Sequence, residues 1–367
     1  MGAADTTNFV HGAQSIQLTT PTAAQGYINK VYSPTLAFNN TSCVRFYYYV
    51  ADKTLMTAGA LLLSHSVDNY TNGFQATWGM GSVRNGWNFR SIPKADFSTM
   101  GAGNWANPIA QARWRATGAA GVKGVLSWDM MTGGVLGTPV VCIEFDDEYS
   151  SVYTLAFPYM KAHNIRGTMY TISNSIGTGG RMTAAQLQEL YINGWDIANH
   201  TADHVNLTTL SQADAQADIA ACKTVLNGYG WTRGSLHLSY PQGAYNSTVK
   251  AACVAEGVLT ARPTSEGGPE YEILPFEDIL AVNPYNSLKS TLSLATMITK
   301  VDQTVAKGGV LIIYGHEIVA AGAAGEQWNV ADFLALIDYI LVYNLPCVTI
   351  SELYRLLSGP VRVPKVR

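Results

Sequence analysis

Two short segments of the sequence combine side chains that together could hold a metal ion. The apolar run VVCIEF leads directly into Asp146 and Asp147, and His200 and His204 stand four residues apart in ANHTADH. Adjacent carboxylates resist joint ionisation unless a positive charge compensates them. Two neutral imidazoles at this spacing can converge on one zinc-like ion, with a carboxylate as third ligand and positions left for water and substrate. Acids are also common in solvated loops and at helix N-termini, so the aspartate pair alone leaves both interpretations open.

A third histidine, His316, follows the apolar run GVLIIYG. Histidine supplies an acid or a base at neutral pH more readily than any other side chain, and a histidine that merely satisfies a loop is the structural alternative. Other catalytic signatures are absent from the sequence. There is no G-x-S-x-G elbow, no P-loop and no C-x-x-C, and HEIVA lacks the second histidine of H-E-x-x-H.

These side chains follow apolar runs that alternate with helical patterns from about residue 135 onward, and the later runs ILAVNPY and CVTI are also expected to be strands. Seven or eight such β-then-α units over roughly 230 residues favour parallel strands with covering helices, and predict a complete or distorted (β/α) barrel. The carboxyl ends of parallel strands share one rim, where barrel enzymes place their chemistry. We therefore expect the aspartates and the three histidines to lie on that rim.

The first part of the chain has a different pattern. Short runs rich in aromatic and β-branched residues, such as SCVRFYYYV and GFQATWGM, are separated by Asn, Gly, Asp and Pro. This pattern predicts an antiparallel β-sandwich at 1–134, joined by the glycine-rich TGGVLGTP to an α/β domain at 135–367. Five of the eight tryptophans fall in the sandwich, where they could stack on sugar rings or fill the core.

Composition excludes several partners. The chain is 47% hydrophobic and 13% charged with a net charge of -3, and it has no Lys or Arg cluster of the kind that binds nucleic acid. No apolar stretch reaches the ~20 residues of a membrane helix, and the first residues lack a signal-peptide pattern. The five scattered cysteines predict buried thiols and no disulfide framework.

In this order the motifs resemble those of the carbohydrate esterase family 4 polysaccharide deacetylases, the NodB homology domain, over about residues 138–357. EFDD resembles the first motif T-F-D-D, HTADH matches H-[ST]-x-x-H in full, and LIIYGH matches the late strand that leads to a histidine. The resemblance implies a metal held by Asp147, His200 and His204. It also implies that Asp146 is the general base and His316 the general acid.

The third family motif, R-x-P-Y-G, is matched only partly by SYPQG. Ser239 stands in the arginine position, and Gln242 replaces the tyrosine beside the matching Pro241. In the family this arginine orients the catalytic aspartate, so we expect Arg262, in TARPT at the end of the next strand, to reach Asp146 instead. The resemblance assigns the oxyanion and substrate side of the site to Gln242, through its backbone N–H, and to Pro241.

The resemblance therefore implies metal-dependent removal of N- or O-linked acetyl groups from an acetylated polysaccharide. Zinc is the expected ion, and cobalt or nickel would also suit two imidazoles and a carboxylate. Two alternatives remain: a catalytically weakened glycan-binding or adhesive protein, suggested by Ser239, and a small-molecule amidohydrolase of the same fold. A glycan substrate implies an extracellular, cell-surface or virion-associated protein. The sequence leaves the polysaccharide and the oligomeric state open.

Overall fold

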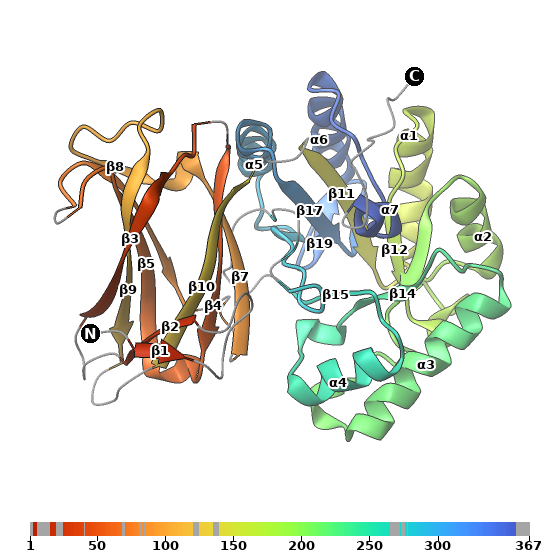
Figure 1. The fold of residues 1–367 in the computed structure, drawn as a ribbon. Helices are drawn as coiled ribbons and strands as arrows, with labels where there is room; N and C mark the ends of the chain where they lie inside the picture. The colour runs from red at the N-terminus through yellow and green to blue at the C-terminus, as the bar shows by residue number, and fades with distance from the viewer. Residues whose placement is uncertain are drawn as a thin grey trace. The chain divides into compact units, whose positions relative to one another are not determined.

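The structure is a computed structural model that divides the chain into two compact units, Met1–Leu136 and Gly137–Arg367 (Figure 1). The residues that it describes are 3–5, 15–19, 25–39, 41–67, 70–80, 83, 86–119, 125–134, 139–264, 272, 276 and 278–356. Residues 135–138 of the expected joint TGGVLGTP lie outside these ranges.

The first unit contains two five-stranded antiparallel sheets. One sheet has the order β1 (Ala3–Asp5), β2 (Ser15–Thr19), β10 (Val125–Gly134), β4 (Cys43–Val50) and β7 (Gly86–Pro93). The other has the order β3 (Gln25–Leu36), β9 (Ile109–Gly118), β5 (Met56–Ser64), β6 (Gly73–Gly79) and β8 (Ser98–Met100). Tyr48, Trp78, Trp114 and Trp128, from both sheets, pack in one buried cluster. Aromatic side chains therefore do fill the core of this unit.

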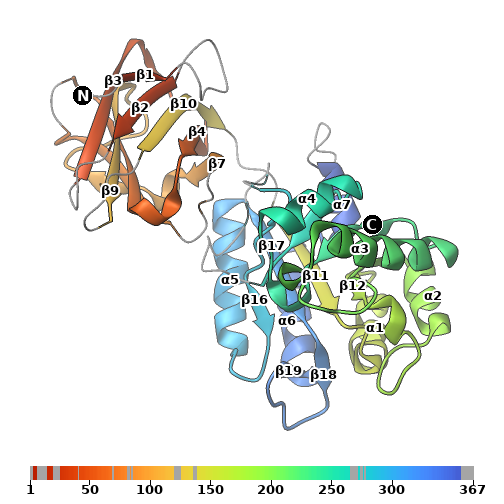
Figure 2. The ribbon, with the colours of Figure 1, turned by 90° about the horizontal axis from the view of Figure 1, so that it is seen from below.

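The second unit is built on a seven-stranded parallel sheet. Its order is β15 (Thr260–Arg262), β14 (Gly234–Ser239), β13 (Asp196–Asn199), β12 (Thr168–Thr171), β11 (Val140–Asp146), β17 (Val310–Gly315) and β16 (Asn286–Leu288). In the described part of the chain β15 and β16 are the two edges, and Figure 2 shows the helices ranged around the strands. This arrangement confirms the distorted barrel, and it brings every strand's carboxyl end to one rim.

Helices lie between most of these strands or follow the last of them, as the alternating sequence pattern predicts. They are α1 (Phe157–Ala162), α2 (Ala184–Ile192), α3 (Gln212–Gly228), α4 (Ser247–Ala255), α5 (Leu294–Lys307), α6 (Val330–Val342) and α7 (Ile350–Leu356). Ser211 caps α3 by accepting the backbone N–H of Asp214 at 3.2 Å. Of the helices in the described ranges, none is long and apolar enough to cross a bilayer.

Two expected strands are absent from the described structure. ILAVNPY, at 279–285, forms turns before the short β16, and CVTI, at 347–350, contributes only an isolated bridge between Cys347 and Val141. Pro284 and Pro346 lie in or beside these segments, and proline cannot donate a backbone hydrogen bond to a strand ladder. A parallel pair of short strands, β18 (Glu317–Val319) and β19 (Gln327–Asn329), follows β17. All five cysteines are free thiols.

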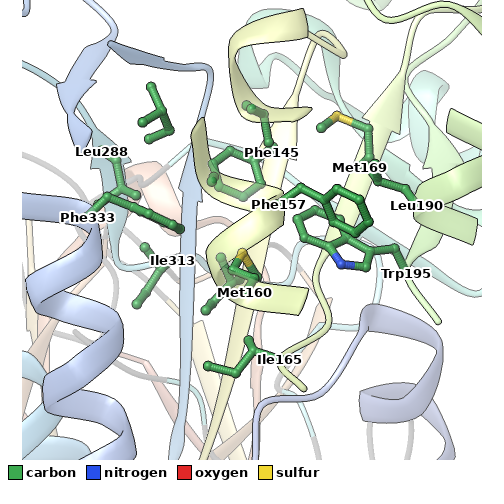
Figure 3. Close-up of a cluster of buried hydrophobic side chains, with 14 of the residues drawn as sticks. Phe145, Phe157, Met160, Ile165, Met169, Leu190, Trp195, Leu288, Ile313 and Phe333 are labelled. Carbon is green, nitrogen blue, oxygen red and sulfur yellow. The ribbon is translucent and has the colours of Figure 1, made fainter. Parts of the chain in front are cut away.

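The core between the sheet and the helices fixes β11 in place. Phe145 stacks on Trp195 with ring centroids 6.0 Å apart, and Phe157 meets the same indole edge-on at 5.9 Å (Figure 3). Burying a side chain of this size contributes about 1.5 to 3 kcal/mol. Because strand residues alternate between faces, anchoring Phe145 on this side directs its neighbours Glu144 and Asp146 to the other.

Candidate metal centre and active site

Asp147, His200 and His204 bring three ligand atoms together at the carboxyl rim. Asp147 follows β11, and the histidines lie on the loop after β13. The Nε2 atoms of His200 and His204 are 3.3 and 3.5 Å from Oδ1 of Asp147. One ligand atom from each residue lies within 4.8 Å of the others. Two imidazoles and one carboxylate form a donor set that suits a zinc-like ion with an open position.

The orientation of His200 is set by the neighbouring strand. Its Nδ1 lies 2.8 Å from the carbonyl oxygen of Ser239, at the end of β14, and a carbonyl can only accept a hydrogen bond. Nδ1 therefore donates its proton to this carbonyl, and Nε2 faces Asp147. This outer hydrogen bond is the arrangement that fixes the tautomer of metal-binding histidines.

Helix α3 holds the histidine loop. Oδ1 of Asp218 accepts the backbone N–H groups of Ala202 at 2.8 Å and Asp203 at 3.1 Å. Oδ1 of Asn199 accepts the N–H of Thr201 at 2.8 Å. Buried backbone donors need such partners, so these carboxylate and amide groups determine the path of the loop. The loop geometry depends on side chains that bind no metal.

Backbone strain is concentrated around the same atoms. Five of the seven non-glycine residues with positive φ in the described structure are Asp147 (69°), Glu148 (36°), Thr201 (63°), His204 (55°) and Gln242 (58°). Such conformations cost of order 1 to 3 kcal/mol each and persist where the surroundings impose them, typically at functional sites. The clustering supports a functional role for this rim.

A further observation indicates that this donor set would suit a cation. Oδ1 of Asp147 is buried and has no hydrogen-bond partner among the described residues, an arrangement that is costly for a carboxylate. Although burial by itself would raise the pKa of Asp147, the close approach of His200 holds that pKa well below the usual range. Burial and the charge of His200 lower the pKa of His204. The aspartate is thus anionic and His204 neutral at pH 7, as metal binding requires.

Arg262 contacts the second aspartate of the rim. Its guanidinium is 2% exposed, forms an ion pair with Oδ1 of Asp146, and places Nε 2.7 Å from Oε2 of Glu144. Its Nη2 also donates to Oγ of Ser239 at 2.8 Å, and Ser239 Oγ lies 3.4 Å from Oδ2 of Asp146. The residue in the family's arginine position and the arginine from the next strand therefore converge on the same carboxylate.

Two aromatic rings enclose this arginine. Its guanidinium carbon lies 4.3 Å from the centroid of Tyr314 and 5.1 Å from that of Tyr170. Burial acts to raise the pKa of Asp146, but the charge of Arg262 outweighs it, and the pKa lies below the usual range. Burial dominates at Glu144 and raises its pKa to about 7. Asp146 is thus the carboxylate kept ionised.

His316 stands beyond the end of β17 on the same rim. Its Nδ1 lies 3.7 Å from Oε2 of Glu326, which also accepts a 2.7 Å hydrogen bond from Oγ of Ser287. After larger contributions from burial and from nearer groups, the charge of His316 helps lower the pKa of both Asp146 and Asp147. An imidazole is therefore within electrostatic reach of both aspartates.

Pro241 and Gln242 form a tight turn after β14. Pro241 is buried, whereas Gln242 is exposed, and its Oε1 accepts a 3.5 Å hydrogen bond from Nδ2 of Asn206. The next residue must be glycine, because its φ is 69° and a Cβ atom there would lie 2.6 Å from the backbone nitrogen of Thr264. The turn holds Gln242 beside the histidine loop that contains Asn206.

Sequence reasoning missed several residues that shape the site. Glu144 had a visible signal, because a carboxylate two residues before Asp146 in an otherwise apolar strand must share its face. Arg181, whose Nη1 donates to the carbonyl of Asp147 and lies 3.7 Å from its Oδ2, had none. Asp218 and Glu326 also gave no signal, because one lies within α3 and the other in a turn before β19, and no spacing along the chain links either to the motifs.

Residues 134–260 match the family model described as polysaccharide deacetylase. The match ends before Arg262 and His316. YxkH of Bacillus subtilis, named for the polysaccharide deacetylases, is 34% identical over 113 residues, which is 30% of this chain and 40% of that protein. The poly-beta-1,6-N-acetyl-D-glucosamine N-deacetylase of Staphylococcus epidermidis is 31% identical over 132 residues, 32% of this chain and 45% of that enzyme. The chain thus spans less than half the length of these curated relatives.

Solved structures are similar at lower identity. A family 4 carbohydrate esterase from Streptomyces lividans, in complex with acetate, is 17% identical with a TM-score of 0.41, over 57% of this chain and 91% of that one. The peptidoglycan deacetylase PdaC from Bacillus subtilis is 14% identical with a TM-score of 0.41, over 60% of this chain and 91% of that one.

Proposed function

We propose, from the premise that this chain carries a polysaccharide deacetylase domain, that it removes N- or O-linked acetyl groups from a polysaccharide with the help of a divalent metal ion. The observation that carries the proposal is one arrangement on the carboxyl rim. Asp147, His200 and His204 present three ligand atoms, one of them a buried carboxylate oxygen that has no hydrogen bond among the described residues. They lie next to Asp146, which Arg262 keeps ionised.

Asp147, His200 and His204 would hold the metal, and zinc is the ion that we expect, with cobalt or nickel as other candidates. When bound, such an ion acts as a Lewis acid on the acetyl carbonyl and lowers the pKa of water. Asp147 and the neutral imidazoles contribute donor atoms only. The hydrogen bond from His200 to Ser239 keeps one of these donors aimed at the site.

Asp146 is the proposed general base. It accepts the proton of the attacking water, and the ion pair with Arg262 keeps the carboxylate deprotonated and fixes its orientation. Arg262 takes over the role that the family gives to the arginine of its third motif, at the position of Ser239. Glu144 holds the other side of the guanidinium, so Arg262 cannot swing away from Asp146 without leaving a buried carboxylate unpaired.

His316 is the proposed general acid, which protonates the departing nitrogen or oxygen of the sugar. The oxyanion that develops on the acetyl group would accept a hydrogen bond from the backbone N–H of Gln242, and Pro241 would shape the same side of the site. Acetate and the deacetylated sugar are the products. A polysaccharide substrate places the protein outside the cell, at the cell surface or on a virion.

An acetate-release assay with metal removal and replacement tests the proposal. The full chain is treated with a chelator, dialysed, and supplied with zinc, cobalt or nickel before incubation with acetylated chitin oligosaccharides and acetylated xylan. We expect acetate release to vanish on chelation and to return with metal. Asp147→Ala should stay inactive in every metal, whereas Asp338→Ala, a surface carboxylate that accepts a hydrogen bond from Tyr159, should behave like the wild type.

Acetate release that survives chelation and persists in Asp147→Ala would contradict the proposed metal centre. Glycan binding without turnover in any metal would favour the catalytically weakened glycan-binding protein. Release of acetate from small acetylated amides, with none from glycans, would favour the amidohydrolase.

A further inference from the structure

The sheet β3-β9-β5-β6-β8 of the first unit carries charge of one sign. Its five strands contain Lys30, Arg113 and Arg115 and no Asp or Glu. The whole unit, residues 1–136, has nine Lys and Arg, five Asp and no Glu, a net charge of +4 within a chain whose total is -3. The two arginines alternate with Trp114, which is buried in the core, so their side chains lie on the outer face.

A tyrosine on this outer face is held in a fixed position. Tyr27 of β3 is 53% exposed, and the guanidinium of Arg113 lies 4.3 Å from its ring centroid. The same guanidinium lies 4.2 Å from the ring of Tyr70, and its Nε donates to Oδ1 of Asn29 at 2.8 Å. Arg113 covers part of Tyr27 and leaves the rest of the ring to solvent. An aromatic surface that is already ordered loses little entropy on binding.

The neighbouring arginine, Arg115, has no partner among the residues that the structure describes. Arg115 is opposite Tyr27 in the β3–β9 register, so the two side chains share the outer face. In the described structure no hydrogen bond, ion pair or ring contact engages the half-buried guanidinium of Arg115. On the other side it pairs in register with Ala60 of β5, which is buried. The guanidinium of Arg115 can bind a carboxylate through two parallel hydrogen bonds, and the exposed ring of Tyr27 beside it can stack on a ligand.

We infer that this outer face binds an anionic polysaccharide, with a sugar ring stacked on Tyr27 and a sugar carboxylate paired with Arg115. Charge complementarity selects this occupant, because the strands that form the face offer cations and no anions. The apolar face of a sugar ring matches the exposed tyrosine, and the carboxylate of a uronic acid matches the unpaired guanidinium. The inference assigns the first unit a binding site of its own and does not depend on the proposed deacetylation.

Binding of hyaluronan oligosaccharides to the full chain tests this site. Isothermal titration at 0.15 M salt compares the wild type with Tyr27→Ala and Arg115→Ala, and we expect each variant to bind roughly tenfold more weakly. Matched controls come from the opposite sheet. Tyr49→Ala and Arg45→Ala remove the same residue types from β4 and should bind within about twofold of the wild type. Thermal unfolding of all four variants checks that each is folded.

Two further probes sharpen the result. An uncharged chitin oligosaccharide and an oligodeoxythymidine of equal length should bind much more weakly than hyaluronan. The inference is overturned if hyaluronan does not bind, if either probe binds as tightly, or if the β4 variants lose as much affinity as the variants of the outer face. Acetate release is measured in parallel on a short acetylated substrate. A chain that binds hyaluronan and releases no acetate supports this site while it contradicts the proposed function.

Discussion

The two units of the chain differ in the sign of their net charge and in how many charged side chains they bury. Residues 137–367 hold fourteen Lys and Arg against twenty-one Asp and Glu, a net charge of -7, whereas the first unit has a net charge of +4. The α/β unit buries Glu144, Asp146, Asp147 and Arg262 at the rim of its sheet. In the sandwich, among residues whose burial the structure describes, Arg90 is the one buried charged side chain.

This difference indicates how each unit would work. Removing an ion from water costs several kcal/mol, so a cluster of buried charges survives only where partners compensate each of them. At the rim most of these charges have partners, whereas Oδ1 of Asp147 and Oε1 of Glu148 are buried without a hydrogen bond among the described residues. The Asp147 oxygen also lies near the Nε2 atoms of His200 and His204, where a cation would compensate it. The sandwich keeps its charges in water and its aromatic side chains mostly in the core. It is therefore suited to surface binding, whereas the α/β unit is suited to chemistry.

The strongest test of this contrast removes the metal ligand. Asp147→Ala should lose bound metal and lower acetate release by roughly 1000-fold or more, because the substrate carbonyl and the water lose their activating ion. Asp146→Ala should lose comparable activity but keep its metal, because the carboxylate of Asp146 is not one of the proposed ligands. Metal content after dialysis, measured by mass spectrometry, separates the two variants. Equal metal loss in both would contradict the division of roles.

Removal of the arginine between the two buried carboxylates should destabilise the fold. Arg262→Ala leaves Asp146 and Glu144 buried without their cation, and we expect the free energy of unfolding to fall by about 3 to 5 kcal/mol. Acetate release should fall roughly 100-fold with metal content retained. Urea unfolding and acetate assays measure both effects.

The exchange Ser239→Arg with Arg262→Ser serves as a matched control for this prediction. It moves the cation to the strand where the family carries it, and activity above that of Arg262→Ala is expected. Unchanged activity in Arg262→Ala would remove Arg262 from the site.

A buried histidine away from the ligand set provides a smaller effect that depends on pH. Burial lowers the pKa of His237 to about 4, and its Nδ1 lies 2.8 Å from Oγ1 of Thr260. The folded pKa lies below the unfolded value of about 6.5, so the stability is present above pH 6.5 and is lost as pH falls toward 4. From pH 8 to pH 5 this residue should cost about 2 kcal/mol.

Unfolding free energies of the wild type and His237→Gln at both pH values measure this loss, which should be absent from the variant. His163→Gln, at an exposed histidine, is the control and should retain the wild-type pH dependence. An equal pH dependence in wild type and His237→Gln would show that the buried ring titrates as it does in water.

The smallest expected effect comes from an arginine of the sandwich. Arg115→Ala should change the free energy of unfolding by less than about 0.5 kcal/mol, because the guanidinium has no partner among the described residues. Chemical denaturation of this variant beside Arg262→Ala compares an unpaired with a doubly paired arginine. A loss above about 1 kcal/mol in Arg115→Ala would break the contrast between the two units.

The sequence anticipated much of the α/β unit because its signals are local. Alternating apolar runs and helical patterns were enough to predict parallel strands, and parallel strands share a carboxyl rim. The structure brings Asp147, His200 and His204 together at this rim, and it brings Arg262 to Asp146. The strands expected at 279–285 and 347–350 were wrong, because proline cannot take part in a regular ladder.

By itself, the sequence determined which residue types stand at which strand ends, and hence the donor set of the rim. The tertiary structure alone decided which partner each donor received. Glu144 is tied to Arg262 across the sheet, His200 is aimed by a carbonyl of the next strand, and Asp218 holds the histidine loop from a helix. Such contacts join residues far apart in the chain, and their energies depend on burial and on distances of a few ångströms. A pattern along the chain cannot encode either quantity, because both are set only when the strands pack side by side.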